Sequence, residues 1–122
     1  MNQVLRHHAE TIISASIQAV LPDAAVKRTL EKKSFPGRVI LVAAGKAAWQ
    51  MSKAACEVLG DTLHSGVCVT KYGHVMGALP HVTCYEAGHP VPDSGSVRGT
   101  QAALDAVAGL KEGDTGLFLL SG

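Results

Sequence analysis

Apolar positions recur at helical spacing near the start of the chain. Residues 2–21 contain neither glycine nor proline, and their apolar side chains repeat every three or four residues. This pattern predicts an amphipathic helix over 2–21, with Asn2 as its N-terminal cap and Pro22 marking its end. A second short helix is expected to start at Asp23, as its cap, and to run to about residue 32.

Short apolar runs alternate with helical stretches through the rest of the chain. The segment 39–44 is unbroken in its apolar character, which predicts a strand over 38–43 that is buried on both faces of a parallel sheet. Further strands are expected at 66–70, 81–86 and 115–120, and helices at 46–59, ended by Gly60, and at 94–110. The strand 81–86 follows only a short loop, so it either pairs antiparallel to 66–70 or lies at an edge.

The last predicted helix begins after Asp93 or Ser94, either of which can cap it. Its expected inner side consists of Val97, Ala103, Leu104, Val107 and Ala108. Strands separated by helices in this way predict an α/β layer fold with a mainly parallel sheet. The chain ends at 119–122, where a buried strand emerges without a covering helix, so we expect an amino-terminal piece of something longer.

Composition narrows the function classes. The chain has 122 residues, a net charge of +1 and no basic run, so neither nucleic acid nor an acidic membrane surface is expected as a partner. Cys56, Cys68 and Cys84 match no zinc or redox spacing. With no signal peptide and no apolar run long enough to span a bilayer, a cytoplasmic protein is expected.

The expected carboxyl ends of the strands carry the unusual residues. Ligands of open α/β sheets bind beyond these ends. The residues that gather there are Gly45, Lys46, Lys71, His74, Glu86, Gly88, His89, Ser121 and Gly122. The opposite ends carry ordinary turn residues such as Pro36, Pro80 and Gly113. Lysines supply positive charge and glycines let backbone N–H groups come close, so this edge predicts a site for phosphate or carboxylate.

Lys46 is the leading candidate because the helix 46–59 would hold it in the first helical turn. A cation there opposes the helix dipole at a cost of roughly 0.3–1 kcal/mol, which makes sense if an anion docks beside the N–H groups. A solvated lysine on a tight turn is the alternative. For each histidine, a hydrogen bond within its loop is an equally good explanation as a role in the site. Glu86 is better explained by bonds to loop amides than by binding of magnesium, and Asp93 by capping of a helix.

Two familiar nucleotide motifs are excluded. The corner around Gly45 and Lys46 lacks the upstream glycine and the following Ser or Thr of a P-loop. The segment 43–48 also fails the G-x-G-x-x-G pattern, so a dinucleotide site has no fingerprint here. Any nucleotide binding must use another geometry.

Four segments occur in an order that resembles a known family. They are Val42-Ala43-Ala44-Gly45-Lys46-Ala47-Ala48, Thr70-Lys71-Tyr72-Gly73-His74, Glu86-Ala87-Gly88-His89-Pro90-Val91-Pro92-Asp93 and Leu119-Leu120-Ser121-Gly122. The chain resembles the start of the class II glycerate 2-kinases, the glycerate kinase/MOFRL family formerly called hydroxypyruvate reductases. The similarity covers essentially the whole chain, and the run 86–93 is its most specific part.

The resemblance implies transfer of the γ-phosphoryl group of ATP to glycerate, giving 2-phosphoglycerate, with a divalent metal such as Mg²⁺. It implies a large Rossmann-like domain of three layers and a smaller second domain, with the active site between them. It maps an active-site lysine onto Lys46 and a phosphate-holding loop onto Ser121 and Gly122. The other matching positions, without individual roles, are Gly45, Lys71, His74, Glu86, His89 and Asp93.

Length is the departure from that family, whose members have several hundred residues. Residues 1–122 are therefore expected to be the amino-terminal portion of the Rossmann-like domain, without the second domain and with little activity alone. Two other functions stay open. One is a hydroxypyruvate reductase-type oxidoreductase, against which the missing glycine fingerprint argues. The other is a non-catalytic α/β module that binds a partner or forms a homo-oligomer through an exposed sheet edge.

Overall fold

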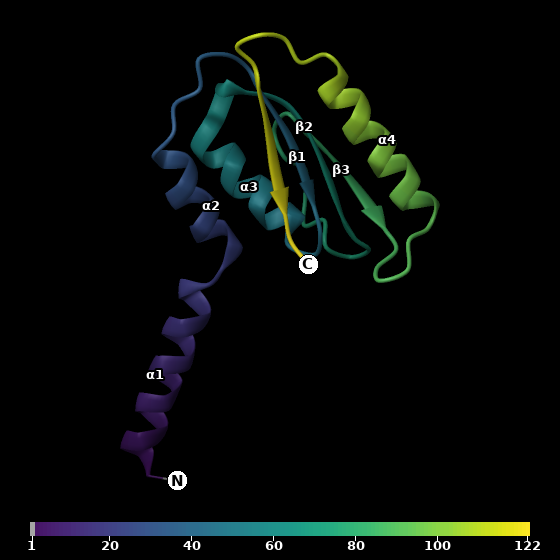
Figure 1. Cartoon of the computed structure of the whole chain (residues 1–122). Coiled ribbons are helices and arrows are strands. Elements are labelled where there is room, and N and C mark those ends of the chain that lie inside the picture. Colours follow the sequence, from purple (N-terminus) through teal and green to yellow (C-terminus); the bar gives the residue numbers. More distant parts are fainter. Residues whose placement is uncertain (1) are drawn as a thin grey trace.

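The computed structural model describes residues 2–122 and consists of four α-helices and four β-strands (Figure 1). In chain order they are α1 (Gln3–Ala19), α2 (Pro22–Glu31), β1 (Val39–Ala44), α3 (Ala48–Leu59), a 3-10 turn (Gly60–Thr62), β2 (Leu63–Lys71), β3 (Val82–Ala87), α4 (Ser94–Ala108) and β4 (Thr115–Leu120). Each element lies where the apolar pattern predicted it, within a few residues at its ends.

The four strands form one sheet in the order β3-β2-β1-β4, and every neighbouring pair is parallel. The antiparallel pairing considered for β3 is therefore wrong, whereas its edge position is confirmed. The loop 72–81 makes the parallel connection possible because it crosses over α3 instead of turning back. Trp49 Nε1 donates to the Gly77 carbonyl oxygen at 3.0 Å, and Cys56 Sγ lies 3.4 Å from the Pro80 carbonyl oxygen.

The sheet is the middle of three layers, with α2 and α3 on one face and α4 on the other (Figure 1). Successive side chains of β1 point alternately to the two faces of the sheet. Val39, Leu41 and Ala43, all fully buried, pack with the inner side chains of α2 and α3. Ile40 and Val42 are buried on the opposite face. A central parallel strand covered on both sides needs this unbroken apolar run. The expected three-layer α/β class is confirmed.

Helix α4 packs through small residues, which corrects the expected inner side. Gly95 and Gly99 are its buried residues, whereas Val97 is 71% and Leu104 57% exposed. Of the other residues expected on the inner side, Ala103 and Val107 are half-buried and Ala108 is exposed. A Cβ atom at Gly99 would lie only 2.7 Å from a methyl carbon of Val69. The helix approaches the sheet so closely that large side chains have no room on the contact face, so they turn outward.

The helix starts differ in part from expectation. Asn2 caps α1 by accepting from the Val4 N–H at 2.8 Å, and Asp93 caps α4 in a capping box with Ser96, as expected. Asp23 is not a cap, because α2 already begins at Pro22, and proline is well suited to the first helical position. Helix α3 begins only at Ala48, so Lys46 lies in the turn before it rather than in its first turn.

Helix α1 projects from the rest of the molecule (Figure 1). None of its residues is buried, although its apolar side chains follow helical spacing. His7 and His8 are exposed on it. No helix among residues 2–122 is long and apolar enough to cross a membrane.

The three cysteines are free thiols that lie between α3 and the β2–β3 edge of the sheet. Cys68 and Cys84 are partners in the register of β2 and β3. Burial is the main cause that raises the pKa of all three thiols, and it raises that of Cys68 to about 12. Cys68 thus packs as a small buried hydrophobe, whereas Cys84 is only half-buried.

Candidate functional site at the carboxyl edge of the sheet

The carboxyl ends of the strands meet at one edge, and the strand order there has a topological switch. From β1 the chain passes through α3 to β2 on one side, while β4, reached through α4, lies on the other side of β1. Ligands of open α/β sheets bind at such a switch point. The residues that flank it are Gly45 and Lys46 after β1, and Ser121 and Gly122 after β4.

Hydrogen bonds join these two strand ends. The Ser121 hydroxyl accepts from the Ala47 N–H at 3.0 Å, and the Ser121 N–H donates to the Ala44 carbonyl oxygen at 2.9 Å. The Lys46 N–H donates to the Gly122 carbonyl oxygen at 3.4 Å. Ser121 thus acts as the cap of α3 from a distant part of the chain. Two of the N–H groups that were expected to face an anion are engaged by residues 121 and 122.

Gly45 makes this corner possible. Its φ of +115° lies in the region that favours glycine, and a Cβ atom there would lie 2.2 Å from the Ser121 carbonyl oxygen. Thr70, which is 3% exposed, fixes the same turn because its hydroxyl donates to the Gly45 carbonyl oxygen at 2.9 Å. Thr70 was not predicted as a site residue, since nothing in a strand residue next to Lys71 indicates a bond to a turn 25 residues earlier.

The structure divides the predicted site residues between the two faces of the sheet. On the α3 side, Lys46 and His74 line one groove of about 500 Å³. The other residues that line it are Pro22, Ala47, Trp49, Gln50, Gly73 and Met76. His74 Nδ1 lies 3.1 Å from the Lys46 carbonyl oxygen. Because a carbonyl oxygen only accepts, Nδ1 donates in this bond, and Nε2 is the nitrogen left for a ligand.

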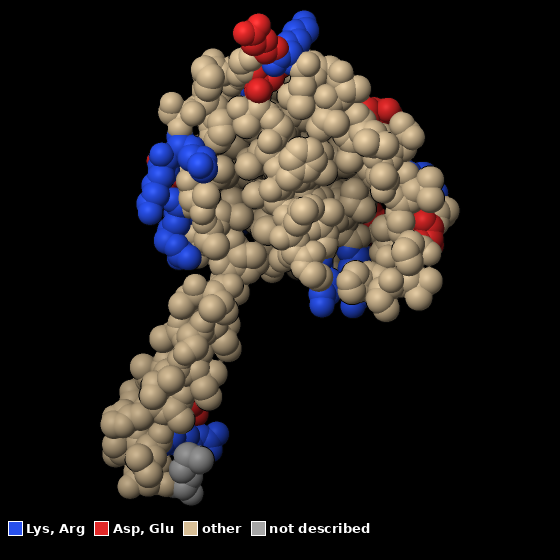
Figure 2. Space-filling model, viewed as in Figure 1, with Lys and Arg blue, Asp and Glu red and all other residues tan. Residues whose placement is uncertain are grey.

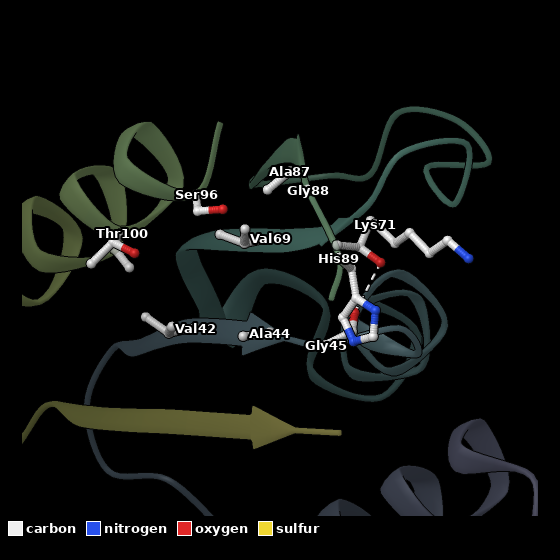
Figure 3. A pocket seen from close by; sticks show the side chains of 12 residues that line it. Val42, Ala44, Gly45, Val69, Lys71, Ala87, Gly88, His89, Ser96 and Thr100 are labelled. Carbon is white, nitrogen blue, oxygen red and sulfur yellow. Dashed lines mark hydrogen bonds between the residues drawn. The ribbon is translucent and has the colours of Figure 1, made fainter. Parts of the chain in front are cut away.

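On the α4 side, Lys71 and His89 lie at the mouth of a second cavity of about 330 Å³. Its walls are mainly apolar and come from Val42, Ala44, Val69 and Ala87. Figure 3 shows Ser96 and Thr100 of α4 lining one end, the His89 ring near Gly45 at the other, and Lys71 extending away from the apolar walls. The expected rim of charged and glycine residues therefore exists, but it consists of two half-sites, one lined by Lys46 and the other by the preceding residue, Gly45.

Glu86 and Asp93 hold the loops of the rim. Glu86 Oε2 accepts from the N–H groups of Gly73 at 2.6 Å and of Val75 at 3.4 Å, so bonding to loop amides is confirmed for Glu86. Asp93 accepts from Gly88 N at 3.0 Å and from the Tyr72 hydroxyl at 2.8 Å. The Gly88 N–H and the Tyr72 hydroxyl lower the pKa of Asp93, and the Asp93 carboxylate raises that of Tyr72.

The lysines of the rim carry positive charge that no carboxylate of the described residues pairs with. Neither Lys46 nor Lys71 belongs to an ion pair among residues 2–122. Figure 2 shows lysine or arginine side chains below the end of the sheet at which β4 finishes. His89 makes no side-chain hydrogen bond within the described residues, so the loop bond considered for it is not found. These ammonium groups fit a phosphate or carboxylate.

The same residues do not fit a resident divalent metal ion. No group of three or more histidine, cysteine, aspartate or glutamate side chains that could hold a metal occurs in the described part of the chain. The two rim carboxylates are already bonded to backbone N–H groups. A metal at this rim would need ligands from elsewhere, such as phosphate oxygens.

Comparison with known proteins agrees with the fold and the motifs. The family model described as a domain of unknown function, DUF4147, matches residues 8–122. The chain belongs to the DUF4147 family. The D-glycerate 2-kinase of Thermotoga maritima is 55% identical over 97% of the chain, which corresponds to 28% of that protein. The glycerate 2-kinase of Pyrococcus horikoshii is 40% identical over 70% of the chain and 19% of its own length.

Solved structures extend the similarity to three dimensions. The crystal structure of glycerate kinase from Thermotoga maritima superposes with a TM-score of 0.92 and 54% identity, over 98% of this chain and 29% of the solved one. An Agrobacterium vitis protein that carries the name hydroxypyruvate reductase is 37% identical over 98% of the chain and 26% of its own length. The matches thus correspond to between 19% and 29% of the length of these relatives.

Proposed function

We propose that this DUF4147 chain is the amino-terminal portion, over residues 1–122, of the Rossmann-like domain of a D-glycerate 2-kinase. The complete enzyme would transfer the γ-phosphoryl group of ATP to a hydroxyl of glycerate, giving 2-phosphoglycerate. The observation that carries the proposal is the Lys46 turn at the topological switch point, in a chain 55% identical to a protein named D-glycerate 2-kinase. A cytoplasmic location goes with it, because all three cysteines are free thiols.

Phosphoryl transfer depends on positioning and on charge stabilisation more than on covalent chemistry. Lys46 would supply positive charge at the groove of the α3 side, beside His74. Lys71, His89 and Gly45 would bind a second part of the substrates at the cavity of the α4 side. Ser121 and Gly122 would fix the corner between the two half-sites through their bonds to Ala47 and Lys46.

Glu86 contributes indirectly to this mechanism. By accepting from the Gly73 N–H, it keeps the loop that carries His74 against the Lys46 turn. ATP supplies the phosphoryl group, and Mg²⁺ would reach the site on the phosphates, since the described side chains do not hold it. The chain alone leaves both half-sites open to water, so we expect little or no turnover from it.

The alternative of a hydroxypyruvate reductase rests on the older name that relatives carry. It lacks support from the site, because the turn after β1 has no G-x-G-x-x-G sequence and the corner is occupied by Ser121. A non-catalytic module that self-associates is the second alternative. Its support is the exposed apolar surface of α1 and β4.

The test is a coupled assay of ADP release with glycerate, ATP and Mg²⁺. It is run on this chain and on a chain extended by the remaining part of the Thermotoga maritima enzyme. We expect activity only in the extended form, and no oxidation of NADH with hydroxypyruvate in either. ADP release that is absent from a folded extended form, or NADH oxidation by it, would overturn the proposal.

Lys46→Ala in the extended form tests the role of the lysine. Removing one preorganised donor of charge is expected to lower turnover about 100- to 1000-fold with the fold intact. Lys53→Ala is the matched control, because Lys53 lies on α3 and pairs with Glu57 at 3.2 Å, outside both half-sites. Equal turnover of the two variants would exclude Lys46 from the mechanism.

A further inference from the structure

Helix α1 displays an apolar surface that nothing in residues 2–122 covers. Its large apolar side chains are 53–66% exposed, and none of its residues is buried. They are Val4, Leu5, Ile12, Ile13 and Ile17, and Val20, directly after the helix, is 78% exposed. An isolated helix of this length is marginal in water, because most helical stability in proteins comes from packing of an apolar face. This exposure therefore indicates a surface that binds something.

The width of the apolar surface limits what can cover it. At 3.6 residues per turn, the six side chains spread over an arc of about 220°. The remaining arc is polar and carries Gln3, His7, Glu10, Thr11, Ser14 and Gln18, whereas Arg6, His8 and Ser16 are polar residues within the mainly apolar arc. A seam between two helices covers a much narrower stripe. The arc thus fits a folded body that contacts α1 from more than one side.

Charge also disfavours pairing of α1 with another copy of itself. Its charged side chains, Arg6 and Glu10, bond to each other at 3.0 Å, and no charged residue follows until Asp23. Helix pairs of the coiled-coil type set their register with flanking charges, which this helix lacks over most of its length.

A second apolar surface lies on β4. Leu117 and Leu119 face α2 and α3 and are half-buried, whereas Phe118 and Leu120 on the opposite face are 58% and 71% exposed. Helix α4 packs on that face mainly over β2 and β3 and also contacts β1, but it leaves Phe118 and Leu120 of β4 exposed (Figure 1). A sheet face of this kind is normally packed in a three-layer fold.

The direction of α1 is shared with a much longer protein. Helix α1 holds 17 of the 122 residues, so the other 105 are 86% of the chain. A TM-score of 0.92 over 98% of the chain therefore requires that α1 project in the same direction in the Thermotoga maritima glycerate kinase. This chain accounts for 29% of that structure, so most of the relative's chain is available to cover α1 and β4.

We propose that the apolar arc of α1 and the outer face of β4 are a docking surface for the part of a DUF4147 protein that this chain does not include. The partner is a folded polypeptide with an apolar surface that surrounds more than half of α1. The proposal requires the family assignment but not kinase activity, so failure of the ADP assay would leave it standing.

The experiment mixes this chain with a polypeptide that comprises the unmatched part of the Thermotoga maritima enzyme, and measures association by sedimentation velocity. We expect a one-to-one complex. Ile12→Lys is expected to weaken it at least about tenfold, because the variant would bury a charged group where the apolar Ile12 side chain is expected to be buried. Phe118→Lys should weaken it similarly. Ser14→Lys, on the polar arc of the same helix, is the matched control and should leave the affinity within about twofold.

A fusion of the two polypeptides covers the case in which the separate partner does not fold. In the fusion, Ile12→Lys should lower the melting temperature by several degrees and Ser14→Lys should not, whereas in the chain alone neither variant should matter. Equal effects of the two variants in the fusion would overturn the proposal. So would a stable dimer of the chain alone that Ile12→Lys dissociates, since a second copy would then be the occupant.

Discussion

Replacing Gly45 by alanine is expected to destabilise the corner where β1, α3 and β4 meet. The added Cβ atom would lie 2.2 Å from the carbonyl oxygen and 2.3 Å from the hydroxyl oxygen of Ser121. Real Cβ atoms do not approach so closely, so Ser121 must move. Its hydroxyl would then leave the Ala47 N–H, and α3 would lose its cap.

The expected loss can be worked out from its parts. A side chain at a φ of +115° costs on the order of 1–3 kcal/mol in backbone strain. Loss of a serine cap costs about 1 kcal/mol more. We therefore expect the free energy of unfolding to fall by about 2–4 kcal/mol. Gly60→Ala is the control for strain alone, because Gly60 also has a positive φ, of +53°, but no atom lies within 4 Å of its Cβ position.

Urea unfolding, followed by the fluorescence of the single tryptophan Trp49, measures both variants. Gly45→Ala should cost about 1 kcal/mol more than Gly60→Ala. Ser121→Ala alone should cost about 1 kcal/mol, and combined with Gly45→Ala it should cost less than the sum, since both remove the same bond. An equal decrease in the free energy of unfolding for Gly45→Ala and Gly60→Ala would refute the reasoning that a side chain at position 45 displaces Ser121.

Two further predictions concern ionisable groups. The Arg38 guanidinium lies 2.7 Å from Asp114 Oδ2 and lowers the pKa of Asp114 from 3.8 to about 2. The ionised Asp114 carboxylate therefore stabilises the fold above about pH 4, and this stabilisation is lost as the pH falls toward 2. The melting temperature of the wild type should therefore exceed that of Asp114→Asn at pH 6, and the gap should shrink at pH 2.5; a constant gap would contradict this cause. Because burial raises the pKa of the Cys68 thiol to about 12, iodoacetamide at pH 8 should leave Cys68 unmodified in the native protein, as peptide mass mapping would show, and modify it in urea. Rapid native labelling would mean that Cys68 is accessible.

The sequence by itself determined the elements and the edge at which they place their chemistry. The unbroken apolar run of β1 indicated a central parallel strand, and β4 was expected at the residues where it occurs, 115–120. The caps Asn2 and Asp93 were readable because a side-chain oxygen bonds to N–H groups only two or three positions away. Glycines and charged residues clustered after the strands, so the rim of candidate residues was predictable from strand direction alone.

Only the tertiary structure decided how that rim is divided. The side of the sheet to which Lys46 and Lys71 belong depends on the strand order β3-β2-β1-β4, which no local pattern encodes. The start of α3 at Ala48 depends on Ser121, which is 74 residues from the amide that it caps. The small-residue face of α4 follows from its close approach to Val69. Local patterns report on neighbours within one or two turns of the chain, whereas these features arise from contacts between segments that only the folded sheet brings together.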